Sequence, residues 1–200
     1  LDLGRCLFCV ECTRTCPTGV IEYTHDYRLA TRKREDLLLE GQAFKLAEAL
    51  GEESLRLFGR SLKLRQVSAG GCNGCEVEVN VLNTVVFDLA RFGIQIGASP
   101  RHADGLIITG PVTGAMKEPL KQAYEATPAP KIVVAVGSCA ISGGPYINHP
   151  QTNNGTESLF PIDLYIPGCP PHPITILDGL LRLLEKRGKE CPGELVDEKA

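Results

Sequence analysis

The sequence predicts an α/β fold built on a parallel sheet. Short apolar runs of strand length alternate with segments whose apolar residues recur at the 3.6-residue period of a helix. Three of the runs lead into Gly-rich or Pro-rich loops that carry cysteine. This alternation indicates parallel strands joined by right-handed helical crossovers. The runs are residues 62–67, 105–109, 131–136 and 163–166.

Helices are expected between these strands. Apolar residues at helical spacing predict a first helix through Val81, Leu82, Val85, Val86 and Leu89. The same spacing predicts a second helix through Met116, Leu120, Ala123 and Tyr124. Pro119 fits the second helix only if it lies in the first turn, where a backbone N–H is not needed.

The chain divides into four segments by these patterns. Residues 1–40 are a cysteine-bearing segment, and residues 61–190 are the α/β domain. Residues 41–60 between them predict a short connector helix, and residues 191–200 are a tail. The helical spacing in the connector is that of Ala43, Leu46, Ala47 and Leu50. Because the chain begins at Leu1 rather than Met, we expect further sequence upstream.

Composition narrows the classes of partner. The chain has 200 residues, of which 21 are basic and 24 acidic, with a formal charge of −3. It lacks the excess of one sign that draws proteins to nucleic acid or anionic lipid. Its apolar stretches, such as residues 132–136, are far shorter than the ~20 residues of a membrane-spanning helix. With no secretory leader at its start, the chain is expected to stay in the cytoplasm.

Nine cysteines in a chain of this kind indicate metal ligation rather than disulfides. The first four have the spacing C-x2-C-x2-C-x3-C and are followed by Pro17, which is the bacterial ferredoxin run. They are Cys6, Cys9, Cys12 and Cys16. A zinc knuckle or free thiols are the alternatives.

The ferredoxin rule divides this run between two clusters. The first three cysteines hold one four-iron cluster, and the fourth binds the neighbouring cluster. Cys6, Cys9 and Cys12 therefore need a fourth ligand from elsewhere. We expect that ligand on an upstream cysteine run or a partner subunit. Cys191, followed by Pro192, is a less favoured source and is otherwise a bystander.

A second group of cysteines is dispersed along the α/β domain. Its members are Cys72, Cys75, Cys139 and Cys169. All of them follow predicted strands, and parallel sheets gather ligands at the carboxyl ends of their strands. Four thiolates converging there suit a four-iron cluster, and the neighbouring glycines let backbone N–H groups approach its sulfurs. Tetrahedral zinc is the competing interpretation.

Other polar residues are weaker candidates. Glu76 directly follows Cys75 and could transfer protons near a metal, although a first-turn acid favoured by the helix dipole is the simpler interpretation. His102 and Arg101 could face a partner or tune a cluster by hydrogen bonding, or simply cap a solvent loop. His172, between two prolines, is interpreted as a rigid loop residue.

Residues 61 to about 185 resemble the small, cluster-bearing subunit shared by group 4 membrane-bound nickel–iron hydrogenases and respiratory complex I, the 20-kDa or B subunit. The motifs that carry the resemblance are GGCNGCE at 70–76, ARFGI at 90–94, SPRHADGLIITGPVT at 99–113, PKIVVAVGSCAISGG at 130–144 and IPGCPPHP at 166–173. Residues 1 to about 40 resemble the second half of a two-cluster ferredoxin subunit of the same complexes. The pair Cys72 and Cys75 has the hydrogenase spacing, whereas complex I subunits carry adjacent cysteines.

The resemblance implies a flavodoxin-like parallel sheet preceded by a partial bacterial-ferredoxin (α+β) segment. It implies an electron-transfer subunit of a hydrogenase-type oxidoreductase complex, of the formate-hydrogenlyase or energy-converting branch, with no complete active site of its own. The implied partners are a large catalytic nickel–iron (or 49-kDa-like) subunit and other ferredoxin and membrane subunits. They would hold the chain on the inner face of the cell membrane. A complex I subunit that passes electrons to quinone, and a zinc-stabilised interaction module, are the alternatives.

Overall fold

The computed structural model describes residues 1–39, 44–59 and 61–185. Five parallel strands form one sheet: β1 (Leu62–Ser68), β2 (Ile94–Ile96), β3 (Gly105–Thr109), β4 (Ile132–Val136) and β5 (Leu164–Ile166). Their spatial order is β2-β1-β3-β4-β5, which is the flavodoxin-like order. The predicted fold is therefore confirmed. The four strands expected from apolar runs are all present, and β2 is an addition.

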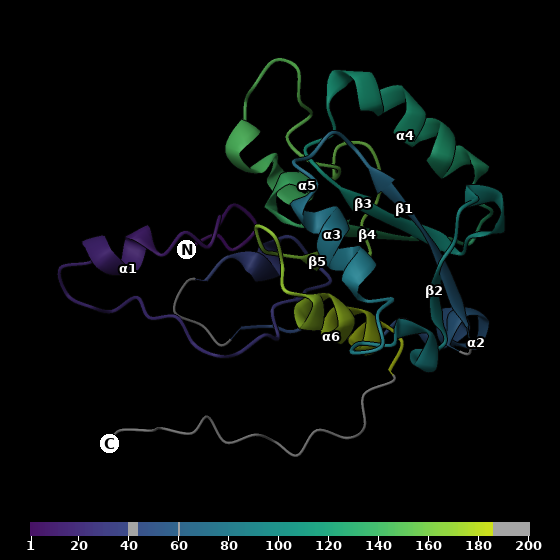
Figure 1. Cartoon of the computed structure of the whole chain (residues 1–200), viewed down its shortest axis with the longest axis horizontal. Helices are drawn as coiled ribbons and strands as arrows, with labels where there is room; N and C mark the ends of the chain where they lie inside the picture. The colour runs from purple at the N-terminus through teal and green to yellow at the C-terminus, as the bar shows by residue number, and fades with distance from the viewer. Residues whose placement is uncertain (40–43, 60, 186–200) are drawn as a thin grey trace.

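Helices cover both faces of the sheet (Figure 1). The helices are α1 (Glu11–Thr15), α2 (Glu52–Phe58), α3 (Gly74–Val81), α4 (Gly114–Ala126), α5 (Ser138–Ser142) and α6 (Pro173–Leu183). Short 3₁₀ turns are η1 (Glu35–Leu37), η2 (Leu89–Phe92), η3 (Pro100–His102) and η4 (Gly144–Tyr146). Helices α3 and α6 bury their apolar residues with Val134 and Ile166 on one face, whereas α4 packs with Leu106 and Val133 on the other.

The N-terminal segment lies along the β5 edge of the sheet. Thr31 and Tyr165 exchange two backbone hydrogen bonds of 3.0 and 2.9 Å in an antiparallel bridge. Leu3 and Leu37 pack in one cluster with Ile141 of α5. An unpaired edge strand invites pairing with other chains, so this contact also shields the sheet. Figure 1 shows α1 projecting beyond this contact, away from the sheet.

Two helix predictions in the α/β domain need correction. Helix α3 ends at Val81, and Val85 and Val86 beyond it are 93% and 79% exposed, so the predicted helix through Leu89 is wrong. The chain there forms i→i+3 turns, closed by a Leu89 N–H to Leu82 carbonyl bond of 3.0 Å. Pro119 is the sixth residue of α4, beyond its first turn. The carbonyl of exposed Ala115, which a proline cannot serve, can be hydrated instead.

The connector is helical only over α2. Leu46, Ala47 and Leu50 lie in irregular backbone, so the longer helix predicted for them is wrong, and Ala43 lies outside the described residues. The Ala47 N–H donates to the Ala30 carbonyl at 2.8 Å and the Leu50 N–H donates to the Leu183 carbonyl at 3.0 Å. Long-range bonds thus take the donors that a helix would use.

Candidate metal centre

Three strand ends bring four cysteines to one edge of the sheet. Cys72 lies in the loop after β1, and Cys75 lies in the first turn of α3. Cys139 is buried in α5 directly after β4, and Cys169 lies in the loop between β5 and α6. All four are free thiols. The structure therefore assembles the group that the sequence predicted, for the topological reason that predicted it.

The four thiols lie close enough to influence one another's ionisation. Burial raises the pKa of Cys75 to about 12, and negative charge on Cys139, Glu76, Cys169 and Cys72 would raise it further. Burial likewise raises the pKa of Cys139 to about 11, with Cys169 and Cys72 adding to the effect. Four thiolates at this edge would repel one another. A positively charged metal centre supplies the charge that lets them ionise together.

Glycines let the backbone pass directly against these sulfurs. A Cβ on Gly137 would collide with the Sγ of Cys75, and a Cβ on Gly144 would lie 2.9 Å from the Sγ of Cys139. A Cβ on Gly74 would lie 3.6 Å from the Sγ of Cys72. Close backbone brings N–H donors within reach of cluster sulfurs. Four thiols in a glycine-lined cradle thus fit a four-iron, four-sulfide cluster.

The arrangement suits a cluster better than a single ion. Among the described residues, no group of three or more His, Cys, Asp and Glu side chains is placed to hold one metal ion. Structural zinc needs all four sulfurs about 2.3 Å from one atom. In a four-iron cluster each thiolate binds a different iron, so the sulfurs stand further apart. This spacing disfavours the zinc alternative.

Glu76 is a buried carboxylate beside this site, with 6% of its surface exposed. Its Oε1 accepts hydrogen bonds from Ser68 Oγ of β1 at 2.6 Å and from Thr109 Oγ1 of β3 at 2.7 Å. The carboxylate thus ties α3 to two strand ends. Sequence analysis missed both hydroxyl partners, since serine and threonine at the end of an apolar run are typical of turns.

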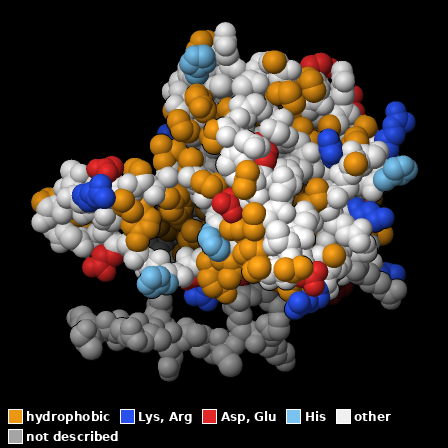
Figure 2. All heavy atoms as spheres, in the orientation of Figure 1, with side chains coloured by type: hydrophobic (Ala, Val, Ile, Leu, Met, Phe, Trp, Pro, Cys, Tyr) orange, Lys and Arg blue, Asp and Glu red, His pale blue; other side chains and the backbone are white. Residues whose placement is uncertain are grey.

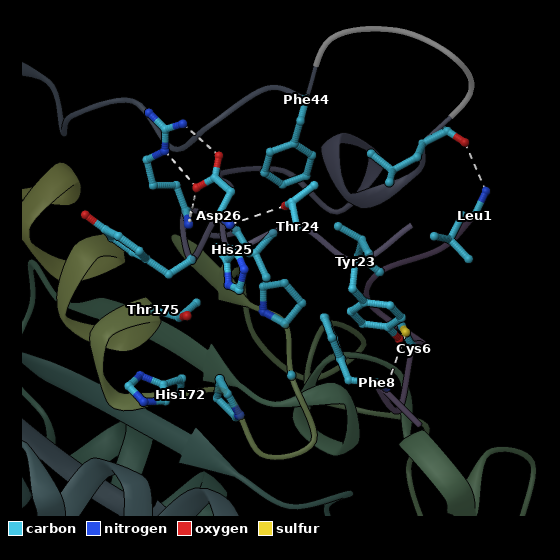
Figure 3. A pocket seen from close by; sticks show the side chains of 18 of the residues that line it. Leu1, Cys6, Phe8, Tyr23, Thr24, His25, Asp26, Phe44, His172 and Thr175 are labelled. Atoms are coloured by element: carbon cyan, nitrogen blue, oxygen red, sulfur yellow. Dashed lines mark hydrogen bonds and ion pairs between the residues drawn. The ribbon is translucent and has the colours of Figure 1, made fainter. Parts of the chain in front are cut away.

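The N-terminal cysteines are less enclosed. Cys6 and Cys12 line a cavity of about 550 Å³ between the N-terminal segment and the loop that carries Cys169. Figure 3 shows Cys6, Phe8 and Tyr23 grouped on one side of it, and His172 beneath. In Figure 2 the cavity is a hollow rimmed by apolar side chains.

Cys9 is exposed, and neither it nor Cys16 lines this cavity. Cys16 lies with its sulfur 3.5 Å from Thr18 Oγ1. The Thr18 hydroxyl and the backbone N–H groups of Thr18 and Val20 lower the pKa of Cys16 to about 7. The described part of residues 1–39 contains α1, η1 and isolated bridges. A ferredoxin-like fold and the cluster assignments of these cysteines stay predictions.

The remaining candidates lie elsewhere. Arg101 and His102 belong to η3, which precedes β3 and so lies at the opposite edge from the cysteine loops. The hypothesis that they tune the cluster by hydrogen bonding is wrong. His172 caps α6, where its Nδ1 accepts from the Ile174 N–H at 3.2 Å. Cys191 lies outside the described residues.

Comparisons with known proteins agree with this site. A family model described as "NADH ubiquinone oxidoreductase, 20 Kd subunit" matches residues 72–183. "Probable membrane-bound hydrogenase subunit mbhJ" of Pyrococcus furiosus is 43% identical over 143 residues, covering 72% of this chain and 86% of the relative. "Formate hydrogenlyase subunit 7" of Escherichia coli is 43% identical over 150 residues, covering 73% of this chain and 59% of the relative.

Solved structures show the same likeness. A chain of an archaeal membrane-bound sulfane sulfur reductase, described as a respiratory membrane complex, superposes with a TM-score of 0.58 and 36% identity. The match covers 66% of this chain and 73% of the archaeal chain. No helix in the described parts of our chain is long and apolar enough to span a bilayer.

Proposed function

Because the chain belongs to the 20-kDa subunit family of NADH:ubiquinone oxidoreductase, we propose that it relays single electrons to or from an active site in a larger partner subunit. Its relatives are subunits of oxidoreductase complexes, both hydrogenases and quinone reductases. The chain is accordingly a subunit of such a complex. The finer proposal is a hydrogenase-type complex in which the partner holds a nickel–iron centre.

The observation that carries the proposal is the convergence of four thiols from three strand-end loops. Cys72, Cys75, Cys139 and Cys169 would bind a 4Fe–4S cluster, which takes up and releases one electron at a time. The chain's own contribution is burial of the site, backbone close to the sulfurs, and a low local charge. These features set the potential at which an electron is accepted.

The hydrogenase assignment is supported by cysteine spacing and by the relatives. Cys72 and Cys75 are two residues apart, which is the spacing the resemblance ties to hydrogenases. Two relatives that match more than 70% of this chain carry hydrogenase or formate hydrogenlyase names. The family description favours the second candidate, a complex I type subunit that delivers electrons to quinone.

Partner contacts follow from the same role. A large catalytic subunit would cover the cysteine edge, over residues 70–76, 110–116 and 139–146. Other ferredoxin and membrane subunits would complete the complex. Because relatives are named as parts of membrane-bound assemblies, we place the chain peripherally at the inner face of the membrane, attached through its partners. The N-terminal cysteines would serve as the more distant electron station.

Metal analysis of the complex purified through this chain separates the candidates. Nickel in stoichiometric amount, together with hydrogen turnover, supports the hydrogenase assignment. Bound quinone and no nickel would transfer the assignment to the complex I type. A colourless preparation with zinc and no iron would refute electron transfer altogether.

A further inference from the structure

Ser138 lies at the junction of three cysteine-bearing segments. It is the first residue of α5, is 1% exposed, and directly precedes Cys139. Its backbone N–H donates to the carbonyl of Gly168 at 2.9 Å, and Gly168 directly precedes Cys169. The backbone thus already joins the Cys139 and Cys169 loops.

The Ser138 hydroxyl extends the junction to the N-terminal segment. Its Oγ lies 2.6 Å from the carbonyl oxygen of Cys6 and 3.2 Å from that of Gly168. A hydroxyl has one proton to donate, and the shorter distance assigns it mainly to Cys6. This bond connects residues 132 positions apart in the sequence.

Ser142 makes a parallel contact at the other end of the same helix. Its Oγ lies 2.9 Å from the carbonyl of Gly4 and 3.1 Å from the carbonyl of Ser138. Both hydroxyls are buried beside the apolar cluster of Leu3 and Ile141. Hydrogen bonds in such surroundings are strengthened by the low local dielectric constant. Two donors spaced along α5 therefore fix two consecutive parts of the N-terminal segment.

The contact also brings the cysteine groups into each other's electrostatic field. The pKa of Cys169 is raised chiefly by burial, then by Cys72 and also by Cys6 of the N-terminal segment. Cys6 therefore faces the four-thiol site across the Ser138 contact. The cavity lined by Cys6 and Cys12 is bounded on its other side by Gly168 and Pro170.

We propose that Ser138 is a positioning residue that holds the N-terminal cysteine segment at a fixed separation from the four-thiol site. One buried hydroxyl and one backbone N–H tie Cys6, Cys139 and Cys169 into a single unit. Separate domains on a flexible linker would allow that separation to vary. The spectroscopic part of the test rests on the proposed cluster binding, whereas the hydrogen-exchange part does not.

Amide hydrogen exchange on the full chain in its complex tests the contact. Ser138→Ala should make the amides of residues 3–9 exchange about five-fold faster, the factor that corresponds to one ordinary hydrogen bond. Ser142→Ala should accelerate the same region through Gly4. Thr156→Val is the matched control, because its buried hydroxyl donates to the Ala140 carbonyl of the same helix at 2.9 Å and makes no contact with the N-terminal segment.

Electron paramagnetic resonance of the reduced complex tests positioning itself. Neighbouring paramagnetic clusters split each other's lines by an amount that falls steeply with their separation. Ser138→Ala should reduce or broaden that splitting while the iron content stays at the wild-type value, and Thr156→Val should leave it unchanged. A merely structural role in α5 would alter stability without moving the splitting.

Two results would overturn the inference. One is unchanged exchange at residues 3–9 in both serine variants. The other is loss of iron in Ser138→Ala with the N-terminal amides still protected, which would confine Ser138 to its own loop. If the wild-type chain carries no iron, the proposed function fails, and the exchange experiment still judges the Ser138 contact.

Discussion

The backbone of Gly137 passes so close to the Sγ of Cys75 that no side chain fits between them. Gly137 lies between β4 and α5, whereas Cys75 lies at the start of α3. The contact therefore joins two of the three loops that build the cysteine site. It also makes the site sensitive to a single methyl group.

Gly137→Ala should disrupt the metal site. The new Cβ would meet the Cys75 sulfur, and φ of 88° at this position is unfavourable for alanine. Strain of this kind costs about 1–3 kcal/mol, before any loss of metal. We expect a lower free energy of unfolding in denaturant titrations and less iron per chain. Gly19→Ala is the matched control, because Gly19 has φ of 66° with nothing within 4 Å, so it should keep its iron.

Glu76 should tolerate an amide better than a truncation. Glu76→Gln keeps an Oε1 acceptor for Ser68 and Thr109, whereas Glu76→Ala leaves two largely enclosed hydroxyls without it. Unsatisfied groups of this kind cost about 1–3 kcal/mol each. Chemical denaturation should therefore show a clear loss only for alanine. Equal loss in both variants would mean that the negative charge, rather than the hydrogen bonds, stabilises the junction.

Turnover of the Glu76→Gln complex addresses the proton-transfer hypothesis. The amide keeps the contacts but cannot carry a proton. If the residue only ties α3 to the strands, activity stays near the wild-type value. A loss of roughly 100-fold or more, at unchanged stability and iron content, would establish a role in proton transfer.

Cys16 should alkylate as a thiolate near neutral pH in the metal-free chain. Its pKa of about 7 is below the ordinary value of 9.0, so the reactive form gains population as pH rises through 7 in the folded chain and only near 9 after unfolding. Thr18→Ala removes the leading cause and should shift the midpoint upward. Cys75, with a pKa of about 12, serves as the internal unreactive comparison. A Cys16 midpoint near 9 in the folded chain would contradict this picture.

Much of this architecture could be predicted from the sequence because buried parallel strands are continuous apolar runs. The five residues of β3 and of β4 are all buried, and both strands were evident. The convergence of the cysteines followed from the rule for strand ends. Strand β2 was missed because three residues give too little pattern.

Features that depend on long-range contacts were beyond the sequence. Val85 and Val86 continue the apolar spacing of α3, but the chain turns at Leu82 and leaves them exposed. Ala47 and Leu50 have helical spacing, although their N–H groups bond to Ala30 and Leu183. The bond from Ser138 to Cys6 has no local signature, because its partners are 132 residues apart.

Iron and acid-labile sulfide counts on the four cysteine variants test the central claim most directly. Replacing Cys72, Cys75, Cys139 or Cys169 with alanine, one at a time in the purified complex, should each remove about four irons and four sulfides per chain and the matching signal of one reduced cluster. Cys191→Ala is the control and should lose neither. Wild-type iron, sulfide and spectra in all four variants would contradict the account.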